Sequence, residues 1–243
     1  GAVAGGLLGS TIGGGNGNSI TNTQATIGGG TSNTATQQLA TIGGGASNTA
    51  GEWAVVAGGV QNNSGRRGFI GGGVYNVASG DLAVVCGGGN TGSGSADGNK
   101  AQSYYGAILG GRNNVISVPS DYSAILAGRS NSATAMYTTV LGSYGAATQT
   151  GEMVLGSAAF ATTGVAQHST LMLALGVAGV ASTDYALTSN AGAASAINQL
   201  ALPTNTFVSF EGLLIITTTT AGTVAAFSIR GAAYRAGGNV TIK

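Results

Sequence analysis

A short phrase recurs ten times between residues 10 and 156: a small residue, a β-forming residue, an aliphatic residue, then glycine or a stand-in for it. The aliphatic positions are Ile12, Ile27, Ile42, Val56, Ile70, Val85, Leu109, Leu126, Leu141 and Leu155. Subtracting successive positions gives steps of 15, 15, 14, 14, 15, 24, 17, 15 and 14 residues. A unit this short cannot bury its own apolar face, so it is stable only when it stacks on neighbouring units. The period therefore predicts an all-β fold, a parallel β-roll or β-solenoid with one coil per repeat.

Each repeat predicts two short strands and two turns. Alternate residues of a strand share a face, so the small residue two positions before the aliphatic one points inward with it; these residues are Ala25, Ala40, Ala54, Ala83, Ala107 and Ala124. Glycines after the aliphatic residue predict one corner, where positive φ favours a residue without Cβ. The second corner is assigned to asparagine, which tolerates the left-handed conformation: Asn18, Asn33, Asn48, Asn62 and Asn76. Two positions further come inward residues of a second strand, Ile20, Ala35, Ala50, Ser64 and Ala78. Ten coils would stack to a length on the order of 50 Å.

Composition narrows the function classes. Only 6% of the 243 residues are charged and the formal net charge is +1, which gives no electrostatic basis for binding nucleic acid or an anionic membrane. No apolar run approaches the roughly 20 residues that span a bilayer. The chain begins at Gly1 without an initiator Met or signal peptide, as expected of a fragment or a processed product. Cys86 is the single cysteine and occupies a slot of small residues, which predicts a buried side chain rather than a reactive thiol.

The position immediately before the aliphatic residue is predicted to face outward. It is polar in the first three repeats and apolar in the next seven: Thr11, Thr26, Thr41, Val55, Phe69, Val84, Ile108, Ile125, Val140 and Val154. A long apolar strip is not left in water on a monomer. We therefore expect self-association, most simply three solenoids packed about a common axis.

The phrase A-x-[IV]-G-G-G-x-x-N-x-A resembles the left-handed parallel β-roll heads of trimeric autotransporter adhesins, and more closely the YadA-type repeats of bacteriophage tail fibres. The likeness covers residues 8–165. Residues 166–243 are similar to a C-terminal β-domain of phage tail fibres, through Thr206-Phe207-Val208-Ser209-Phe210, Gly212-Leu213-Leu214-Ile215 and Ala226-Phe227-Ser228-Ile229-Arg230-Gly231-Ala232. Relatives usually carry an Arg-rich segment where this chain has Ile215-Ile216-Thr217-Thr218-Thr219-Thr220. The resemblance implies trimerisation, but it names no receptor.

We accordingly expect two domains, a solenoid shaft over residues 1–165 and a small β-sandwich-like knob over residues 166–243. The repeat ceases in the second region and strand-like runs replace it: Leu171 to Leu175, Leu200 to Leu202, Thr206 to Thr220, Val224 to Ile229 and Val240 to Lys243. A β-rich knob would cover the end of the solenoid, whose unpaired edge is an aggregation hazard.

The slot four positions before the aliphatic residue is a second outer column. It holds Glu52, Arg66 and Asp81 in three successive repeats, which predicts an acid–base–acid ladder of cross-strand pairs. Tyr105, Tyr122 and Tyr137 follow in the next three. Their stacked rings suit either the apolar faces of sugar rings or an aromatic contact between subunits, and both interpretations stay open.

The slot three positions after the aliphatic residue changes from glycine to Arg112 and Arg129. Two stacked guanidinium groups need an anion, either a carboxylate of a neighbouring subunit or an acidic group of a host glycan. The step of 24 marks an insertion over residues 87–106 that ends in Tyr104 and Tyr105. Loops on a rigid scaffold commonly carry recognition, although a tolerated insertion explains the step equally well. The candidate receptor-binding residues are Tyr104, Tyr105, Tyr122, Tyr137, Arg112 and Arg129.

The enzyme hypothesis is weak. The seven acidic residues include no pair at a spacing typical of an acid–base couple, although glycosidase carboxylates about 5 to 9 Å apart can meet across a subunit boundary, as in a polysaccharide-degrading tailspike. A single histidine, His168, argues against a histidine-based metal site, and no cofactor is expected. The row Thr11, Thr26 and Thr41 leaves an ice-binding solenoid as a minor alternative.

The resulting functional expectation is a homotrimeric virion fibre that binds a host-cell surface glycan or lipopolysaccharide and contacts other virion or fibre proteins. It would act by multivalent binding, without nucleic acid and without membrane insertion. The alternative from the same resemblance is the head of a bacterial trimeric autotransporter adhesin at the cell surface.

Overall fold

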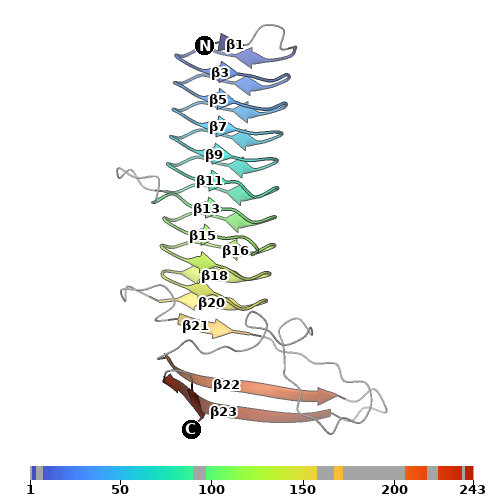
Figure 1. Cartoon of the computed structure of the whole chain (residues 1–243), viewed down its shortest axis with the longest axis vertical. Helices are drawn as coiled ribbons and strands as arrows, with labels where there is room; N and C mark the ends of the chain where they lie inside the picture. Colours follow the sequence, from blue (N-terminus) through green and yellow to red (C-terminus); the bar gives the residue numbers. More distant parts are fainter. Residues whose placement is uncertain are drawn as a thin grey trace. The chain divides into compact units, whose positions relative to one another are not determined.

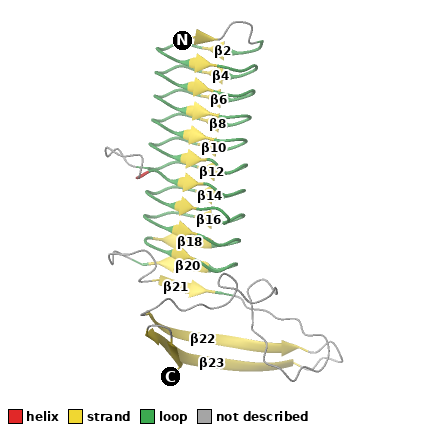
Figure 2. Cartoon of the chain, viewed as in Figure 1, coloured by secondary structure: helices red, strands yellow, loops and turns green. Residues whose placement is uncertain are grey.

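The structure is a computed structural model that describes residues 2–3, 8–89, 97–157, 167–171, 206–217, 224–236 and 239–242. It divides into two compact units, Gly1–Gln199 and Leu200–Lys243. In the first unit, short parallel strands stack coil on coil into two sheets, as the repeat predicted (Figures 1 and 2). The predicted domain boundary at residue 165 stays a prediction.

Two residues per coil form each strand of the first sheet, called sheet A here. Its strands are β1 (Ala2–Val3), β3 (Ser19–Ile20), β5 (Thr34–Ala35), β7 (Thr49–Ala50), β9 (Asn63–Ser64), β11 (Val77–Ala78), β13 (Lys100–Ala101), β15 (Val115–Ile116), β17 (Ser132–Ala133) and β19 (Ala146–Ala147). Sheet B contains β2 (Thr11–Ile12), β4 (Thr26–Ile27), β6 (Thr41–Ile42), β8 (Val55–Val56), β10 (Phe69–Ile70), β12 (Val84–Val85), β14 (Ala107–Ile108), β16 (Ala124–Ile125), β18 (Thr139–Gly142), β20 (Met153–Gly156) and β21 (Gln167–Thr170).

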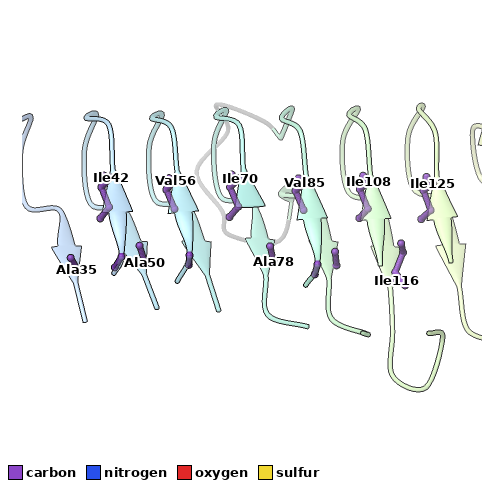
Figure 3. Close-up of a cluster of buried hydrophobic side chains, with 14 of the residues drawn as sticks. Ala35, Ile42, Ala50, Val56, Ile70, Ala78, Val85, Ile108, Ile116 and Ile125 are labelled. Atoms are coloured by element: carbon purple, nitrogen blue, oxygen red, sulfur yellow. The ribbon is translucent and has the colours of Figure 1, made fainter. Parts of the chain in front are cut away.

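The interior is a pair of aliphatic rows, one from each sheet. The second residue of each sheet B strand from β4 to β16 and the second residue of each sheet A strand from β5 to β19 is buried. Figure 3 shows the row Ile42, Val56, Ile70, Val85, Ile108 and Ile125 opposite the row Ala35, Ala50, Ala78 and Ile116. The predicted inward residues Ile20, Ala35, Ala50, Ser64 and Ala78 are all buried, which confirms the two-strand coil.

The predicted alignment is wrong by one residue from the seventh repeat onward. Val85 pairs with Ile108 rather than Leu109, and the buried row continues through Ile125, Val140 and Val154. These four residues were expected to face outward. Ala107 and Ala124, expected inside, are instead the half-buried outward residues of their strands. The error arose because each of these repeats has two adjacent aliphatic residues, and the first of the pair is the inward one.

A buried asparagine ladder joins successive coils. It consists of Asn18, Asn33, Asn48, Asn62, Asn76, Asn99, Asn114 and Asn131. The Asn33 Nδ2 group donates to the Gly29 carbonyl at 3.0 Å and to the Gly45 carbonyl of the next coil at 2.9 Å, while its Oδ1 accepts the Asn48 N–H at 3.0 Å. The corner was predicted correctly, but for the wrong reason. The left-handed residue is the one before the asparagine, such as Ser32 with φ of 55°, and the asparagine itself satisfies buried backbone groups of two coils.

Glycine is required at the first corner by two separate constraints. Gly30 adopts φ of 92° and Gly45 adopts φ of 90°, a region that strains other residues. A Cβ on Gly30 would also collide with the Gly45 carbonyl oxygen of the next coil. The glycine triplets therefore allow the coils to stack at this corner, as predicted.

The last coil is closed by a reversed strand. β21 runs antiparallel to β20, with Met153 opposite Thr170. The Gln167 side chain reaches sheet A, where its Oε1 accepts the Ala146 N–H at 2.7 Å and its Nε2 donates to the Ala146 carbonyl at 2.9 Å. The amide of Gln167 thus replaces the peptide group that a further strand beside β19 would supply.

The second unit contains a three-stranded antiparallel sheet. Its strands are β22 (Thr206–Thr217), β23 (Val224–Ala236) and β24 (Asn239–Ile242), in the order β22–β23–β24. The runs from Thr206, Val224 and Val240 were predicted as strands. The runs predicted at 172–175 and 200–202 lie outside the described residues. Arg230 and Glu211 form an exposed salt bridge of 2.8 Å across the β22–β23 pair.

Candidate functional site

Three tyrosine rings stack along the outside of successive coils, in what we call the tyrosine ladder: Tyr105, Tyr122 and Tyr137. The first two ring centroids are 4.8 Å apart with an interplanar angle of 9°, and the next two are 5.4 Å apart at 8°. Each ring stands in a turn with φ between 55° and 58°, just before a strand of sheet B. The repeat spacing predicted this column correctly.

Stacking limits what the tyrosine ladder can bind. Both faces of the Tyr122 ring are covered by its neighbours, so its exposed part is the ring edge and the hydroxyl group. A sugar could stack only on the outer faces of Tyr105 and Tyr137. The edges and hydroxyl groups suit contacts with another apolar surface or hydrogen bonds.

The repeat alignment placed the three tyrosines in the same column as Glu52, Arg66 and Asp81. The structure shows that they belong to the neighbouring column. The Tyr105 N–H bonds to the Asp81 carbonyl, just as the Arg67 N–H bonds to the Glu52 carbonyl one position after the acid. The tyrosines therefore extend the column of Trp53, Arg67 and Leu82. Tyr104, which is 57% exposed, extends the acid–base column instead, and its N–H donates to Asp121 Oδ1 at 3.1 Å.

A second column runs parallel to the tyrosines on sheet B, and we call it the leucine ladder: Leu109, Leu126, Leu141 and Leu155. These side chains are 38% to 52% exposed, although the repeat alignment had assigned them to the interior. Their strands pair in register, with Val140 opposite Val154 and Leu141 opposite Leu155. Between the two ladders lie small or half-buried residues, Ala107, Ala124 and Thr139. The two ladders, with these residues between them, form an apolar outer face of sheet B.

Arg112 and Arg129 lie beyond the leucine ladder, on the corner after the glycines. They form a parallel bridge, so the two residues are neighbours on adjacent coils, as predicted. The Arg129 guanidinium carbon lies 5.0 Å from the centroid of the Tyr144 ring. Like charges directly opposite each other across a bridge are destabilising, so this corner favours an anion.

The predicted acid–base–acid ladder is present. Arg66 donates to Glu52 Oε2 and to Asp81 Oδ2, both at 3.1 Å. Arg67 approaches Asp81 at 3.5 Å, and its guanidinium carbon lies 4.6 Å from the centroid of the Trp53 ring. These charges are therefore compensated within the chain, so they are weaker candidates for binding a partner.

The insertion is shorter than its predicted range of 87–106. Asn99 occupies its place in the asparagine ladder and Lys100–Ala101 forms β13, so a regular coil has resumed before Tyr104 and Tyr105. Both tyrosines stand in the turn of this coil rather than in a displayed loop. Residues 90–96 lie outside the described residues.

Cys86 was predicted to be buried, but it is exposed. It occupies the outward position that glycine holds in other coils and that leucine holds from Leu109 onward. The slot faces outward in every coil, so its small residues in the first coils do not indicate an interior position.

The described residues contain no group of three or more His, Cys, Asp or Glu side chains placed to hold a metal ion. No helix in the described part of the chain is long and apolar enough to cross a membrane. Comparison with protein-family models and with curated proteins found no match. In its described residues the first unit is therefore a parallel β-solenoid with an apolar outer face on sheet B.

Proposed function

We propose that the chain is a segment of a homotrimeric fibre on a virion, and that the fibre attaches the virion to a glycan on the host-cell surface. The observation that carries the proposal is the apolar face of sheet B, where the tyrosine and leucine ladders stand exposed on consecutive coils. The resemblance to tail-fibre repeats supports the same assignment.

The apolar face favours association because its residues gain most when water is removed from them. Fully burying an exposed leucine contributes about 1.5 to 3 kcal/mol, and each of the four leucines is already about half buried, so each would add roughly half of that. Contiguous apolar patches of this kind mark interaction sites on soluble proteins. Three parallel copies, each with sheet B toward a common axis, would bury both ladders of every copy, and the surroundings would be the same in all three.

Attachment is assigned to the turn that contains Tyr104. Tyr104 is among the most exposed aromatic residues that the structure describes. An exposed aromatic ring suits the apolar face of a sugar ring. Three such turns on one rigid support would convert weak single contacts into avid binding.

The attachment function is tested by binding the purified fluorescent protein to a panel of bacterial strains, before and after periodate oxidation of their surface glycans. We expect periodate to abolish binding, and Tyr104→Ala to weaken binding about tenfold or more without changing the mass of the assembly. Tyr104→Phe, which keeps the ring, is the matched control and should bind normally. Binding that survives periodate and Tyr104→Ala would contradict the proposal.

A bacterial trimeric autotransporter adhesin head is the second candidate, since the same repeats resemble it and the same face would form its trimer. The minor ice-binding hypothesis rests on Thr11, Thr26 and Thr41, which are exposed and paired on adjacent strands. Thermal hysteresis of the purified protein would favour that hypothesis, and its absence would leave the fibre.

A further inference from the structure

Opposite charges border the apolar face of sheet B on its two sides. Asp121 lies in the turn before β16, and Arg129 lies at the corner after the same strand. Arg112 stands beside Arg129 on the adjacent coil. The face therefore has an acidic edge, next to the tyrosine ladder, and a basic edge, next to the leucine ladder.

The salt bridges within the described residues leave these two edges out. They join Arg66 and Arg67 to Glu52 and Asp81, and Arg230 to Glu211. Asp121 instead accepts a backbone N–H from Tyr104 through Oδ1. Arg129 has Arg112 on one side and the Tyr144 ring on the other, so its nearest neighbours along the column supply a like charge and a π face.

Two other acidic residues lie near these edges. Asp97 lies next to Arg112 on the preceding coil, because the Asn113 N–H bonds to the Asp97 carbonyl. It is therefore one coil further from Arg129 than Arg112 is. The Glu152 carboxylate is buried and accepts the N–H groups of Thr148 and Gln149. Asp121 and Arg129 are therefore the residues of the two edges that lie on the same coil.

We propose that the basic edge of one copy of this chain binds the acidic edge of a second copy, with Arg129 facing Asp121 of the neighbour and Arg112 beside it. The inference rests on the proposed trimer and specifies how its subunits meet. When two copies run parallel with their sheet B faces together, the edge before the strand in one copy meets the edge after the strand in the other. Antiparallel face-to-face copies would place like edges together, so the charges select the parallel arrangement.

The same pairing resolves the repulsion between the stacked arginines. A carboxylate from the neighbour would lie against two adjacent guanidinium groups at the margin of an apolar contact, where solvent screening is weaker than at an open surface. It would close a ring of three identical contacts, each joining different edges of adjacent copies. The tyrosine and leucine ladders of adjacent copies would meet inside that ring.

Charge reversal and its rescue test the inference on the full chain. Arg129→Glu alone and Asp121→Arg alone should each raise the protein concentration at which the trimer dissociates by at least tenfold, measured by analytical ultracentrifugation in low salt. The double variant, which exchanges the charges, should restore dissociation to within about threefold of wild type. Arg66→Glu, an equal charge change in a cluster that is paired within the chain, is the matched control and should leave dissociation unchanged.

The outcomes separate this inference from the proposed function. The edge pairing is wrong if the wild type is a trimer and neither single reversal changes its dissociation, or if the double variant does not restore it. The fibre proposal would remain in that case. A wild-type monomer overturns both. If Arg129→Glu abolishes binding to bacteria while the trimer stays intact, the arginines bind an anionic group of the receptor and the edge pairing is wrong.

Discussion

The first coils and the last coils of the solenoid share one interior and differ in their outer face. Both are filled by aliphatic residues and joined by buried asparagines. On sheet B, the first coils present Thr26 and Thr41 beside the flat backbone of Gly28 and Gly43, whereas the last coils present the tyrosine and leucine ladders. The difference teaches that the repeat specifies the coil through its inward positions, which leaves the outward positions open to a separate role.

The largest expected effect is the loss of association when the apolar outer face of the last coils is made polar. Replacing Leu126 and Leu141 by Ser should convert the proposed trimer to monomers at micromolar concentration, because each half-exposed leucine loses roughly 1 kcal/mol of burial in all three copies. Size-exclusion chromatography with light scattering measures the change. Thr26→Ser with Thr41→Ser, the same number of changes on the first coils, should keep the mass of the wild type. Equal dissociation by both pairs would show that the two regions do not differ in this way.

The shared interior predicts equal effects in the two regions. Asn48→Ala and Asn114→Ala should each lower the free energy of unfolding by about 3 kcal/mol, because each removes donors to two glycine carbonyls and an acceptor for the next asparagine N–H. Urea denaturation followed by circular dichroism measures both variants. An effect confined to one of them would contradict a common interior.

A smaller effect sharpens the account of the tyrosine ladder. Tyr122→Ala should cost about 1 to 3 kcal/mol, because the central ring stacks on two neighbours. Tyr122→Phe keeps the stack and should unfold like the wild type. Thermal unfolding and the near-ultraviolet circular dichroism of the tyrosines measure the change. If Phe destabilises as much as Ala, the hydroxyl group rather than the stack carries the stability.

The smallest expected effect concerns the acid–base–acid ladder. Arg66→Gln should lower the free energy of unfolding by less than about 1 kcal/mol, because half of the Arg66 side chain is exposed to solvent. Its effect should shrink further in high salt. Urea denaturation at two salt concentrations checks this, and a loss above about 2 kcal/mol would mean that the ladder is part of an interface.

The coil could be predicted from the sequence because its signals are local and periodic. The inward aliphatic residues, the glycine corners and the asparagine column all recur with the repeat, and the structure confirms the corners, the column and the inward residues as far as Val85. The alignment failed where Ile108 and Leu109 are both aliphatic, since hydrophobicity alone does not say which one points inward. The asparagine ladder held the missing signal: the inward residue stands six positions before the asparagine, and Asn114 and Asn131 therefore select Ile108 and Ile125.

The candidate site was predictable only in part for the same reason. The spacing predicted the tyrosine stack and the adjacent arginines correctly. Both depend only on the distance in sequence from one coil to the next, and that distance is unchanged when the whole alignment moves by one residue. The alignment placed the leucine ladder inside and the tyrosines in the acidic column, because those assignments depend on the absolute register. The exposure of Cys86 was missed because a column of small residues suits either a narrow interior or an outward face, and sequence does not distinguish the two.

The mass of the wild-type protein in solution, by light scattering on a sizing column, tests the central claim most directly. One chain has a mass of 23.3 kDa, and the account predicts three chains, three times 23.3 kDa or about 70 kDa. A stable species of one chain would contradict the assignment of the tyrosine and leucine ladders to a subunit interface, and with it the fibre.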